Sequence, residues 1–303
     1  MKAGFLNLYK PVGWTSHDCV AKVRRLLNLK KVGHGGTLDP AASGVLPIAI
    51  GRATRLLQFL PEDKTYRAVM RFGVTTTTDD LEGDIVMSQS ASSLSQSQAI
   101  APLSQFLGTF AQIPPRYSAV QVQGRRLYDL ARKGEAVDIP LRSVTVHHII
   151  PLDWQPGDFP ELTVEIACGA GTYIRSIARD WGAILGLGGT LAALERTRSS
   201  GFSLATSLTL TQLETQVTAG TFLPISPAIA LQHLPALSLP AEQAWRWQQG
   251  QKISCSDAIA RSQVSFYRVL DVTQTFLGVT GWRTEPETAQ TILLPKVVFV
   301  TPQ

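Results

Sequence analysis

Residues 33–51 read GHGGTLDPAASGVLPIAIG, a glycine-rich stretch whose one acidic side chain is Asp39. Basic sequence precedes it, and Arg52 and Arg55 follow it. Nearby positive charge favours an ionised carboxylate, and glycine lets the backbone approach a ligand closely. The stretch therefore predicts a carboxylate presented as a nucleophile or a base. The same residues also fit an Asp-Pro turn whose carboxylate binds its own backbone, and both interpretations stay open at this point.

The positive charge of the chain is concentrated around this stretch. The 303 residues carry 28 Lys and Arg against 23 Asp and Glu, a net charge of +5. Residues 1–75 hold 12 basic and 4 acidic residues, residues 76–160 hold 6 and 9, and residues 161–303 hold 10 and 10. The first segment is expected to attract a polyanion, most simply nucleic acid, by steering and counterion release. A merely solvated basic face is the alternative.

Composition and motifs argue against several classes of protein. An apolar fraction of 44% and a charged fraction of 17% are typical of a soluble globular protein. We expect no signal peptide and no transmembrane helix. Three widely spaced cysteines predict neither disulfides nor a zinc cluster, and favour a reducing cytosol. His34 has no second ligand at metal-binding spacing, and no phosphate-binding glycine loop follows a strand.

Apolar periodicity predicts both helices and strands. One helix is expected to begin with Ser16 as its N-cap. Others are expected over residues 49–60, 97–107 and 124–134, and from the end of the 169–175 stretch to about residue 185. Alternation predicts strands over residues 65–72 and 162–168. A proline-rich stretch near residues 220–240 precedes short strands at 264–270, 275–280 and 297–300, so we expect a small β-rich domain after residue 225.

Two further groups of residues suit recognition of a nucleotide. Tyr66 lies on a strand with basic side chains. Tyr173 and Arg175 stand two apart where another strand ends, so both can point to one side. Such a pair could stack on a base and bind a carboxylate or a phosphate. The alternative is a buried tyrosine with an arginine at a helix N-terminus.

Together these motifs resemble the TruB-type tRNA pseudouridine synthases, which isomerise uridine 55 in the T arm of tRNA. The resemblance covers residues 5–200 and is carried by ordered motifs. They are GHGGTLDP at 33–40, Lys10-Pro11 with Gly13, Thr15 and Ser16, KTY at 64–66, PPRYSA at 114–119, the stretch 124–134, and GTYIR at 171–175. It implies an α+β pseudouridine-synthase fold, with a large mixed, mostly antiparallel sheet flanked by helices. Residues 1–224 would form the catalytic domain, and residues 225–303 a small β-rich (PUA-like) RNA-binding domain.

The resemblance also implies a reaction. Asp39 would be the nucleophile on a flipped-out uridine, whose C1′–N1 bond breaks and whose base rejoins the sugar through C5. The carboxylate could attack the base, attack the sugar or remove a sugar proton, and the sequence does not choose among these. An isomerisation needs no metal or organic cofactor. The base must leave its stack, which costs a few kcal/mol.

Each remaining site residue takes a role from the same resemblance. Tyr66 would stack on the uracil and exchange a proton, and Arg175 would pair with Asp39 as part of the catalytic group. Tyr173 and Leu194 would border the base, His34 would fill the space that the base vacates, and Lys10, with the basic region 22–31, would contact phosphates. One departure is Thr76-Thr77-Thr78, where the family usually has Thr-Asp-Thr.

The expected partner is the T-arm stem-loop of tRNA, bound by a cytoplasmic monomer with no guide RNA and no membrane. Two alternatives stay open. One is a non-catalytic RNA-binding or RNA-folding protein that uses the same basic face. The other is a synthase within a guide-RNA particle, which the absence of a lysine-rich tail disfavours.

Overall fold

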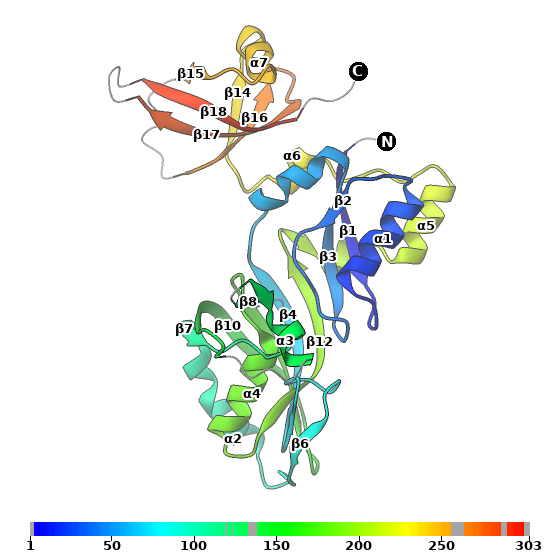
Figure 1. Ribbon diagram of the computed structural model, residues 1–303, viewed down its shortest axis with the longest axis vertical. Helices are drawn as coiled ribbons and strands as arrows, with labels where there is room; N and C mark the ends of the chain where they lie inside the picture. The colour runs from blue at the N-terminus through cyan, green and yellow to red at the C-terminus, as the bar shows by residue number, and fades with distance from the viewer. Residues whose placement is uncertain are drawn as a thin grey trace.

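A computed structural model of the chain describes residues 3–118, 120–122, 124–132, 138–255, 264–285 and 290–299. The molecule is elongated, with a large sheet through its middle and lower parts and a small sheet at its upper end (Figure 1).

The large sheet has nine strands among the described residues, and its main path runs β1-β3-β12-β4-β11-β10-β7, with β2 beside β3 and β13 beside β12. Its paired strands are antiparallel, except that β3 and β12 run parallel. The α+β class with a mixed, mostly antiparallel sheet is thereby confirmed. The strands are Gly4–Lys10 (β1), Val32–His34 (β2), Ser43–Ile50 (β3), Lys64–Phe72 (β4), Gly108–Gln112 (β7), Arg142–Gln155 (β10), Glu161–Cys168 (β11), Gly189–Ser199 (β12) and Phe202–Ser203 (β13).

Helices bury apolar side chains against this sheet. Trp181 of α4 packs edge-on against Phe72 of β4, with ring centroids 5.5 Å apart. Val20 and Val23 of α1 share a second apolar cluster with β1, β3 and α5. The helices of this part are Ser16–Leu26 (α1), Gln96–Ile100 (α2), Leu127–Arg132 (α3), Ile174–Ile184 (α4), Leu210–Thr218 (α5) and Pro227–Ala230 (α6), with 3₁₀ helices Gly51–Phe59 (η1), Ala101–Phe106 (η2) and Leu204–Thr206 (η3).

The start of α1 differs by one residue from the expectation, because Thr15 and not Ser16 is the N-cap. The Thr15 hydroxyl accepts from Asp18 N (3.0 Å), and the Asp18 carboxylate accepts from Thr15 N (3.0 Å). This reciprocal pair is a capping box. Ser16, the first helical residue, turns its hydroxyl toward the loop that holds Asp39.

The helix expected over residues 49–60 is wrong at its start and in its type. Strand β3 continues to Ile50, and the following helix, η1, is a 3₁₀ helix. All eight residues of β3 are buried, and an uninterrupted apolar run is typical of a strand that is covered on both faces. The helix expected over 97–107 is split in two, since α2 ends at Ile100 and η2 follows it.

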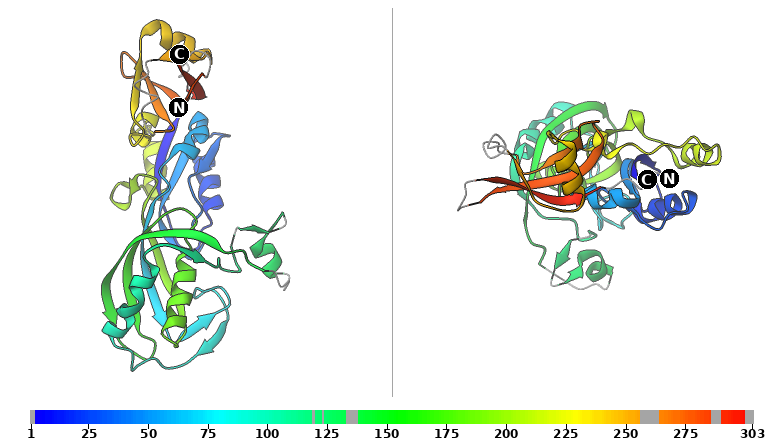
Figure 2. Two further views of the ribbon diagram at one scale, coloured as in Figure 1. Left: turned by 90° about the vertical axis from the view of Figure 1, so that its left-hand side faces the viewer. Right: turned by 90° about the horizontal axis from the view of Figure 1, so that it is seen from above.

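The other expected elements lie close to their predicted places. Strands β4 and β11 match the predictions for 65–72 and 162–168, and α4 matches the helix before residue 185. Within 124–134, α3 follows the short strand Arg125–Arg126 (β9); residues 133 and 134 lie outside the described ranges. Strand β9 pairs with Gln121–Val122 (β8), and these elements project from the side of the large sheet (Figure 2).

A second hairpin carries the acidic loop that follows β4. It is made of Val74–Thr76 (β5) and Ile85–Ser88 (β6), which pair antiparallel. The loop between them therefore returns to the large sheet, where Leu191 N of β12 donates to Asp79 O (3.0 Å).

The small sheet has the order β14-β16-β17-β18-β15 and packs against α7. Strands were expected at 264–270, 275–280 and 297–300; the third begins earlier than expected, and Val300 lies outside the described residues. The 224/225 boundary remains a prediction; Ile225 pairs with Phe5 of β1, and the small sheet starts at Ala236. The elements are Ala236–Leu239 (β14), Ala241–Gln248 (α7), Ile253–Cys255 (β15), Tyr267–Asp271 (β16), Phe276–Thr284 (β17) and Thr291–Val298 (β18).

Apolar contacts join the two sheets through η1, because the rings of Phe59 and Phe266 lie 5.1 Å apart. In the part of the chain that the structure describes, no helix has the length and apolar character needed to cross a membrane.

Candidate active site

Asp39 lies in the loop between β2 and β3, and the main chain of this loop is held by hydrogen bonds. The Ser16 hydroxyl accepts from Leu38 N (2.9 Å) and donates to Leu38 O (3.1 Å). Ala42 N donates to Asp39 O (3.1 Å), which closes a turn. The Asp39 side chain nevertheless remains 41% exposed. The backbone is thus fixed while the carboxylate stays accessible.

The Asp39 carboxylate forms an ion pair with Arg175, which lies far away in the sequence. Arg175 Nη2 is 2.8 Å from Asp39 Oδ2, and the Arg175 side chain is 7% exposed. A charge-assisted hydrogen bond of this length is strong and directional. The structure therefore contains the pairing that the resemblance implies. The turn interpretation is also partly right, since the backbone turns at Asp39, but the carboxylate binds an arginine.

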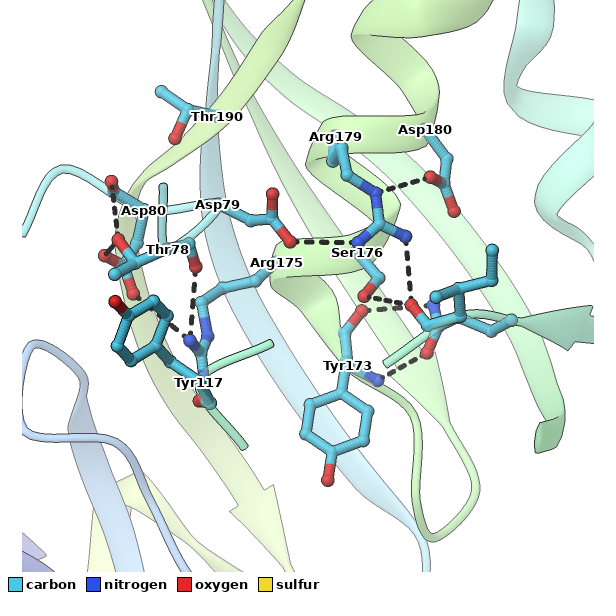
Figure 3. A network of polar contacts seen from close by, with 12 residues as sticks. Thr78, Asp79, Asp80, Tyr117, Tyr173, Arg175, Ser176, Arg179, Asp180 and Thr190 are labelled. Atoms are coloured by element: carbon cyan, nitrogen blue, oxygen red, sulfur yellow. Dashed lines mark hydrogen bonds and ion pairs between the residues drawn. The ribbon is translucent and has the colours of Figure 1, made fainter. Parts of the chain in front are cut away.

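Arg175 is itself held by two segments that meet at the N-terminus of α4 (Figure 3). Its Nη1 donates to Thr78 O (3.2 Å), and its Nη2 donates to Tyr117 O (3.1 Å). Nη1 also lies 3.6 Å from Asp80 Oδ2. The guanidinium thus binds two carboxylates and two carbonyls, and its position is determined before any substrate arrives.

A second arginine, one helical turn further along α4, connects the same two segments. Arg179 Nη1 binds Asp79 Oδ2 (3.0 Å), and its Nη2 donates to Ile113 O (2.9 Å). Ser176 Oγ donates to the same carbonyl (2.8 Å), as Figure 3 shows. Burial raises the pKa of the Asp79 carboxyl, while Arg179 opposes this rise. The network keeps the segments that surround Arg175 in place.

Sequence reasoning missed Asp80, although it identified the acidic loop. The Asp80 side chain is 10% exposed. Thr78 Oγ1 donates to Asp80 Oδ1 (2.5 Å), and Thr76 Oγ1 donates to Asp80 O (2.6 Å). Thr77, at the position of the departure from the family pattern, accepts from Asp84 N (3.1 Å). The run of threonines directly before the two aspartates, whose hydroxyls can donate to a carboxylate, is a sequence signal that could have identified Asp80.

Lys10 does not have the role that was expected of it. Its side chain is fully buried, and its ammonium donates to the carbonyls of Pro11 (2.9 Å), Trp14 (2.6 Å) and Pro40 (3.3 Å). Burial lowers the pKa of this ammonium. A phosphate cannot reach it in this structure, so the expected phosphate contact is wrong. Lys10 instead ties the residue after Asp39 to the end of β1.

Tyr66 lies on β4 and is 7% exposed. Burial raises the pKa of its phenol to about 12, and the charge of Arg196 partly opposes this rise. The phenol is therefore neutral at physiological pH. Arg196, also missed by sequence reasoning, is fully buried directly across from Tyr66 on β12.

His34 and Tyr173, two further residues expected at the site, are each held by hydrogen bonds that involve the main chain. His34 Nδ1 accepts from Gly36 N (3.3 Å), and burial, followed by His17 and Arg196, lowers the pKa of its imidazole. Tyr173 is fixed through its main chain, since Gln112 accepts from Tyr173 N (2.9 Å) and donates to Tyr173 O (3.1 Å). The ring of Tyr173 lies to one side of Arg175 and does not point toward its guanidinium (Figure 3).

A pocket beside Asp39 brings together three of the predicted residues: Asp39, Arg175 and Leu194. Asp80 and Glu82 add acidic groups to its lining, and apolar side chains complete it. Tyr66, Tyr173, His34 and Lys10 are not in the lining of this pocket. It therefore offers a carboxylate, its arginine and an apolar wall to one ligand.

Basic side chains near α1 face solvent. Arg24, Arg25, Lys30 and Lys31 are exposed, whereas Lys22 pairs with Glu214 (3.2 Å). Such a surface suits a polyanion. Across the described ranges, no group of three His, Cys, Asp or Glu residues is placed to hold a metal ion.

Comparison with known proteins identifies the family. Residues 24–174 match the TruB family pseudouridylate synthase (N terminal domain), and residues 235–286 match Pseudouridine synthase II TruB, C-terminal. The tRNA pseudouridine synthase B of Trichormus variabilis is 59% identical over 98% of this chain and 98% of its own length. That of Acaryochloris marina is 57% identical over 98% of both chains.

Solved structures agree with this assignment. The crystal structure of a Cbf5-Nop10-Gar1 complex contains a chain with a TM-score of 0.72 to this one, at 26% identity, covering 98% of this chain and 84% of that one. The similarity spans both sheets, and the sequence relatives span almost the whole chain. The protein therefore belongs to the TruB family of pseudouridylate synthases.

Proposed function

We propose that this protein is a stand-alone tRNA pseudouridine synthase that isomerises uridine 55 in the T arm of tRNA, with Asp39 as nucleophile. Its relatives named tRNA pseudouridine synthase B support tRNA as the substrate. The observation that carries the site assignment is the accessible Asp39 carboxylate, bound at 2.8 Å to a buried arginine beside a pocket. No guide RNA, metal or organic cofactor takes part in the proposed reaction.

The reaction breaks the C1′–N1 bond, rotates the uracil and forms a C1′–C5 bond. C5 loses its proton and N1 gains one, so atoms and charge balance without a co-reactant. Arg175 binds Oδ2 of Asp39 and directs the carboxylate toward the pocket. Asp39 then attacks C6 of the base or C1′ of the sugar, or removes a sugar proton to give a glycal. The other carboxylate oxygen, Oδ1, is left to carry out this step.

The base-binding roles follow the same proposal. Leu194 lies in the pocket lining and forms an apolar wall for the uracil. Tyr66 stacks on the flipped base, which requires the covered ring to become accessible when RNA binds. Tyr173 borders the base, and His34, held neutral by its lowered pKa, stacks in the space that the base vacates. These contacts offset the cost of about a few kcal/mol for unstacking the base.

The remaining proposals concern the RNA and the protein as a whole. The exposed basic residues of the 22–31 region contact phosphates of the T arm. Residues 1–224 form the catalytic domain, and residues 225–303 form an additional RNA-binding domain. We propose a monomer that acts in the cytoplasm, where its buried free cysteines, Cys19 and Cys168, stay reduced.

The test incubates purified protein with unmodified tRNA, without guide RNA, and maps pseudouridine. We expect modification at the T-loop uridine. Asp39→Asn should abolish it while binding of a T-arm stem-loop survives, and Asp153→Asn, which changes an exposed residue of β10, should behave like the wild type. Full activity of Asp39→Asn would overturn the mechanism, and RNA binding without any modification would favour the non-catalytic RNA-binding protein.

A further inference from the structure

Arg196 stands at the centre of the large sheet, between the two strands that carry the site. Its strand, β12, lies between β3 and β4. Arg196 is paired with Gly44 of β3 on one side and with Tyr66 of β4 on the other. Gly44 has φ +108°, and a Cβ at this position would clash with the Arg196 backbone. Only glycine allows β12 to approach this closely.

The Arg196 guanidinium binds main-chain carbonyls. It is fully buried, and it donates to Val45 O (2.8 Å), Thr37 O (3.2 Å) and Gly36 O (3.2 Å). Among the residues that the structure describes, no carboxylate forms an ion pair with it. Gly36 and Thr37 come directly before Leu38 and Asp39, and Val45 lies on the strand that follows them. Arg196 therefore fastens the start of the Asp39 loop to β3.

Arg196 binds the loop at a segment whose own residues restrict its conformation little. Gly35 and Gly36 are consecutive glycines, and Gly36 has φ +138°, so the loop has few steric constraints of its own. Burying a cation without a carboxylate is costly, and each carbonyl bond offsets part of that cost. Together with Ser16 at Leu38 and Lys10 at Pro40, Arg196 holds the main chain of the loop on both sides of Asp39.

We infer that Arg196 is a positioning residue for the reaction, which sets the place of the Asp39 carboxylate by holding the Gly36 and Thr37 carbonyls. It acts through the main chain and does not contact the RNA. A displacement of about 1 Å at a reacting group can cost on the order of 10²-fold in rate. Loss of Arg196 therefore lowers the rate of the chemical step and leaves RNA affinity nearly unchanged. The inference rests on the proposed function.

The test compares Arg196→Met, Arg196→Lys and the wild type. Arg198→Met is the matched control, because Arg198 is exposed on the same strand. The single-turnover rate at saturating enzyme measures the chemical step on a T-arm stem-loop. The Kd for the same stem-loop already containing pseudouridine measures binding. Both are measured well below the Tm of each variant, determined by circular dichroism.

We expect a rate about 10²-fold lower in Arg196→Met, a smaller loss in Arg196→Lys, whose ammonium can still reach a carbonyl, and a Kd within about 3-fold of the wild type in both. Arg196→Lys provides the result if Arg196→Met does not fold. A folded variant with a wild-type rate would overturn the inference, as would a loss confined to Kd. An inactive wild type would instead count against the proposed function, because the inference concerns the rate of each Arg196 variant relative to the rate of the wild type.

Discussion

Two buried arginines hold Asp39 and its loop, and they bind different groups. Arg175, on α4, binds the carboxylate itself and has Asp80 as a second acidic neighbour. Arg196, on β12, binds three carbonyls of the main chain around the same loop. One arginine therefore binds the reacting carboxylate, and the other binds the main chain that carries it.

The charge of the Asp39 carboxylate and the position of its loop are therefore controlled by different arginines. Removing Arg175 leaves the carboxylates of Asp39 and Asp80 without their shared cation. Removing Arg196 leaves the charge of Asp39 balanced but frees the loop that carries it. Substitution of Arg175 should therefore also affect a second carboxylate, that of Asp80, whereas substitution of Arg196 should not.

The largest effect is expected from Arg175→Met. The variant loses the donor that binds Asp39, together with the guanidinium's contacts to Asp80, Thr78 O and Tyr117 O. We expect the single-turnover rate on a T-arm stem-loop to fall by about 10²–10³-fold. The free energy of unfolding should fall by about 3 kcal/mol, because Asp80 is left buried without its cation.

Urea unfolding and the single-turnover assay measure the two effects. Arg71→Met is the matched control, since Arg71 pairs with Glu161 at 2.6 Å elsewhere on the sheet. It should destabilise less and leave the rate unchanged. A rate in Arg175→Met close to that of the control would mean that the ion pair is structural only.

Asp80→Asn should have a smaller effect. The Asp80 carboxylate lies 3.6 Å from Arg175, further than Asp39 does. The asparagine keeps an oxygen for Thr78 Oγ1 and Glu82 N but loses its charge. We expect a rate about 10-fold lower, equivalent to about 1.4 kcal/mol, with unchanged RNA affinity. Asp84→Asn, on the exposed part of the same loop, serves as control. Equal rates in both variants would mean that the charge of Asp80 does not contribute to the reaction.

Sequence reasoning identified Asp39 and Arg175 but missed Asp80 and Arg196. Asp39 and Arg175 lie in short motifs with glycine or tyrosine neighbours, so local chemistry pointed to them. Asp80 and Arg196 lie in stretches where a charged residue is ordinarily at the surface. Strand pairing of β12 with β3 and β4 buries Arg196, and Asp80 lies in a loop that bridges to Leu191 of β12 and faces Arg175. Local sequence contains neither arrangement.

Errors in the predicted elements have a similar origin. Residues 49–60 have helical periodicity, but β3 is a fully buried central strand, and its burial extends the strand to Ile50. The phosphate contact of Lys10 was implied by the family resemblance, and a sequence motif does not show how deeply a side chain is buried. The position of Lys10 at the end of β1, beneath the Pro40 carbonyl, is a property of the sheet. Tertiary packing decided both cases.

The smallest predicted effect uses His34 to probe the charge around Arg196. Partial burial lowers the pKa of the half-buried imidazole, and His17 and Arg196 add to this lowering. Between the folded pKa and the ordinary value near 6.5, the unfolded chain binds more protons than the folded chain. His34 therefore contributes stability that is fully present above about pH 6.5 and is lost as the pH falls through its folded pKa.

Protonation of His34 removes the acceptor for Gly36 N and adds a cation near Arg196, whose guanidinium donates to three main-chain carbonyls. The measurement is urea unfolding of the wild type and of His34→Gln at pH 7.5, 6.5, 5.5 and 5.0. The wild type should lose stability relative to the variant only below about pH 6.5. A difference that is constant with pH would mean that His34 stays equally protonatable in the fold, and a difference of opposite sign would mean that a carboxylate, and not Arg196, governs this side of the loop.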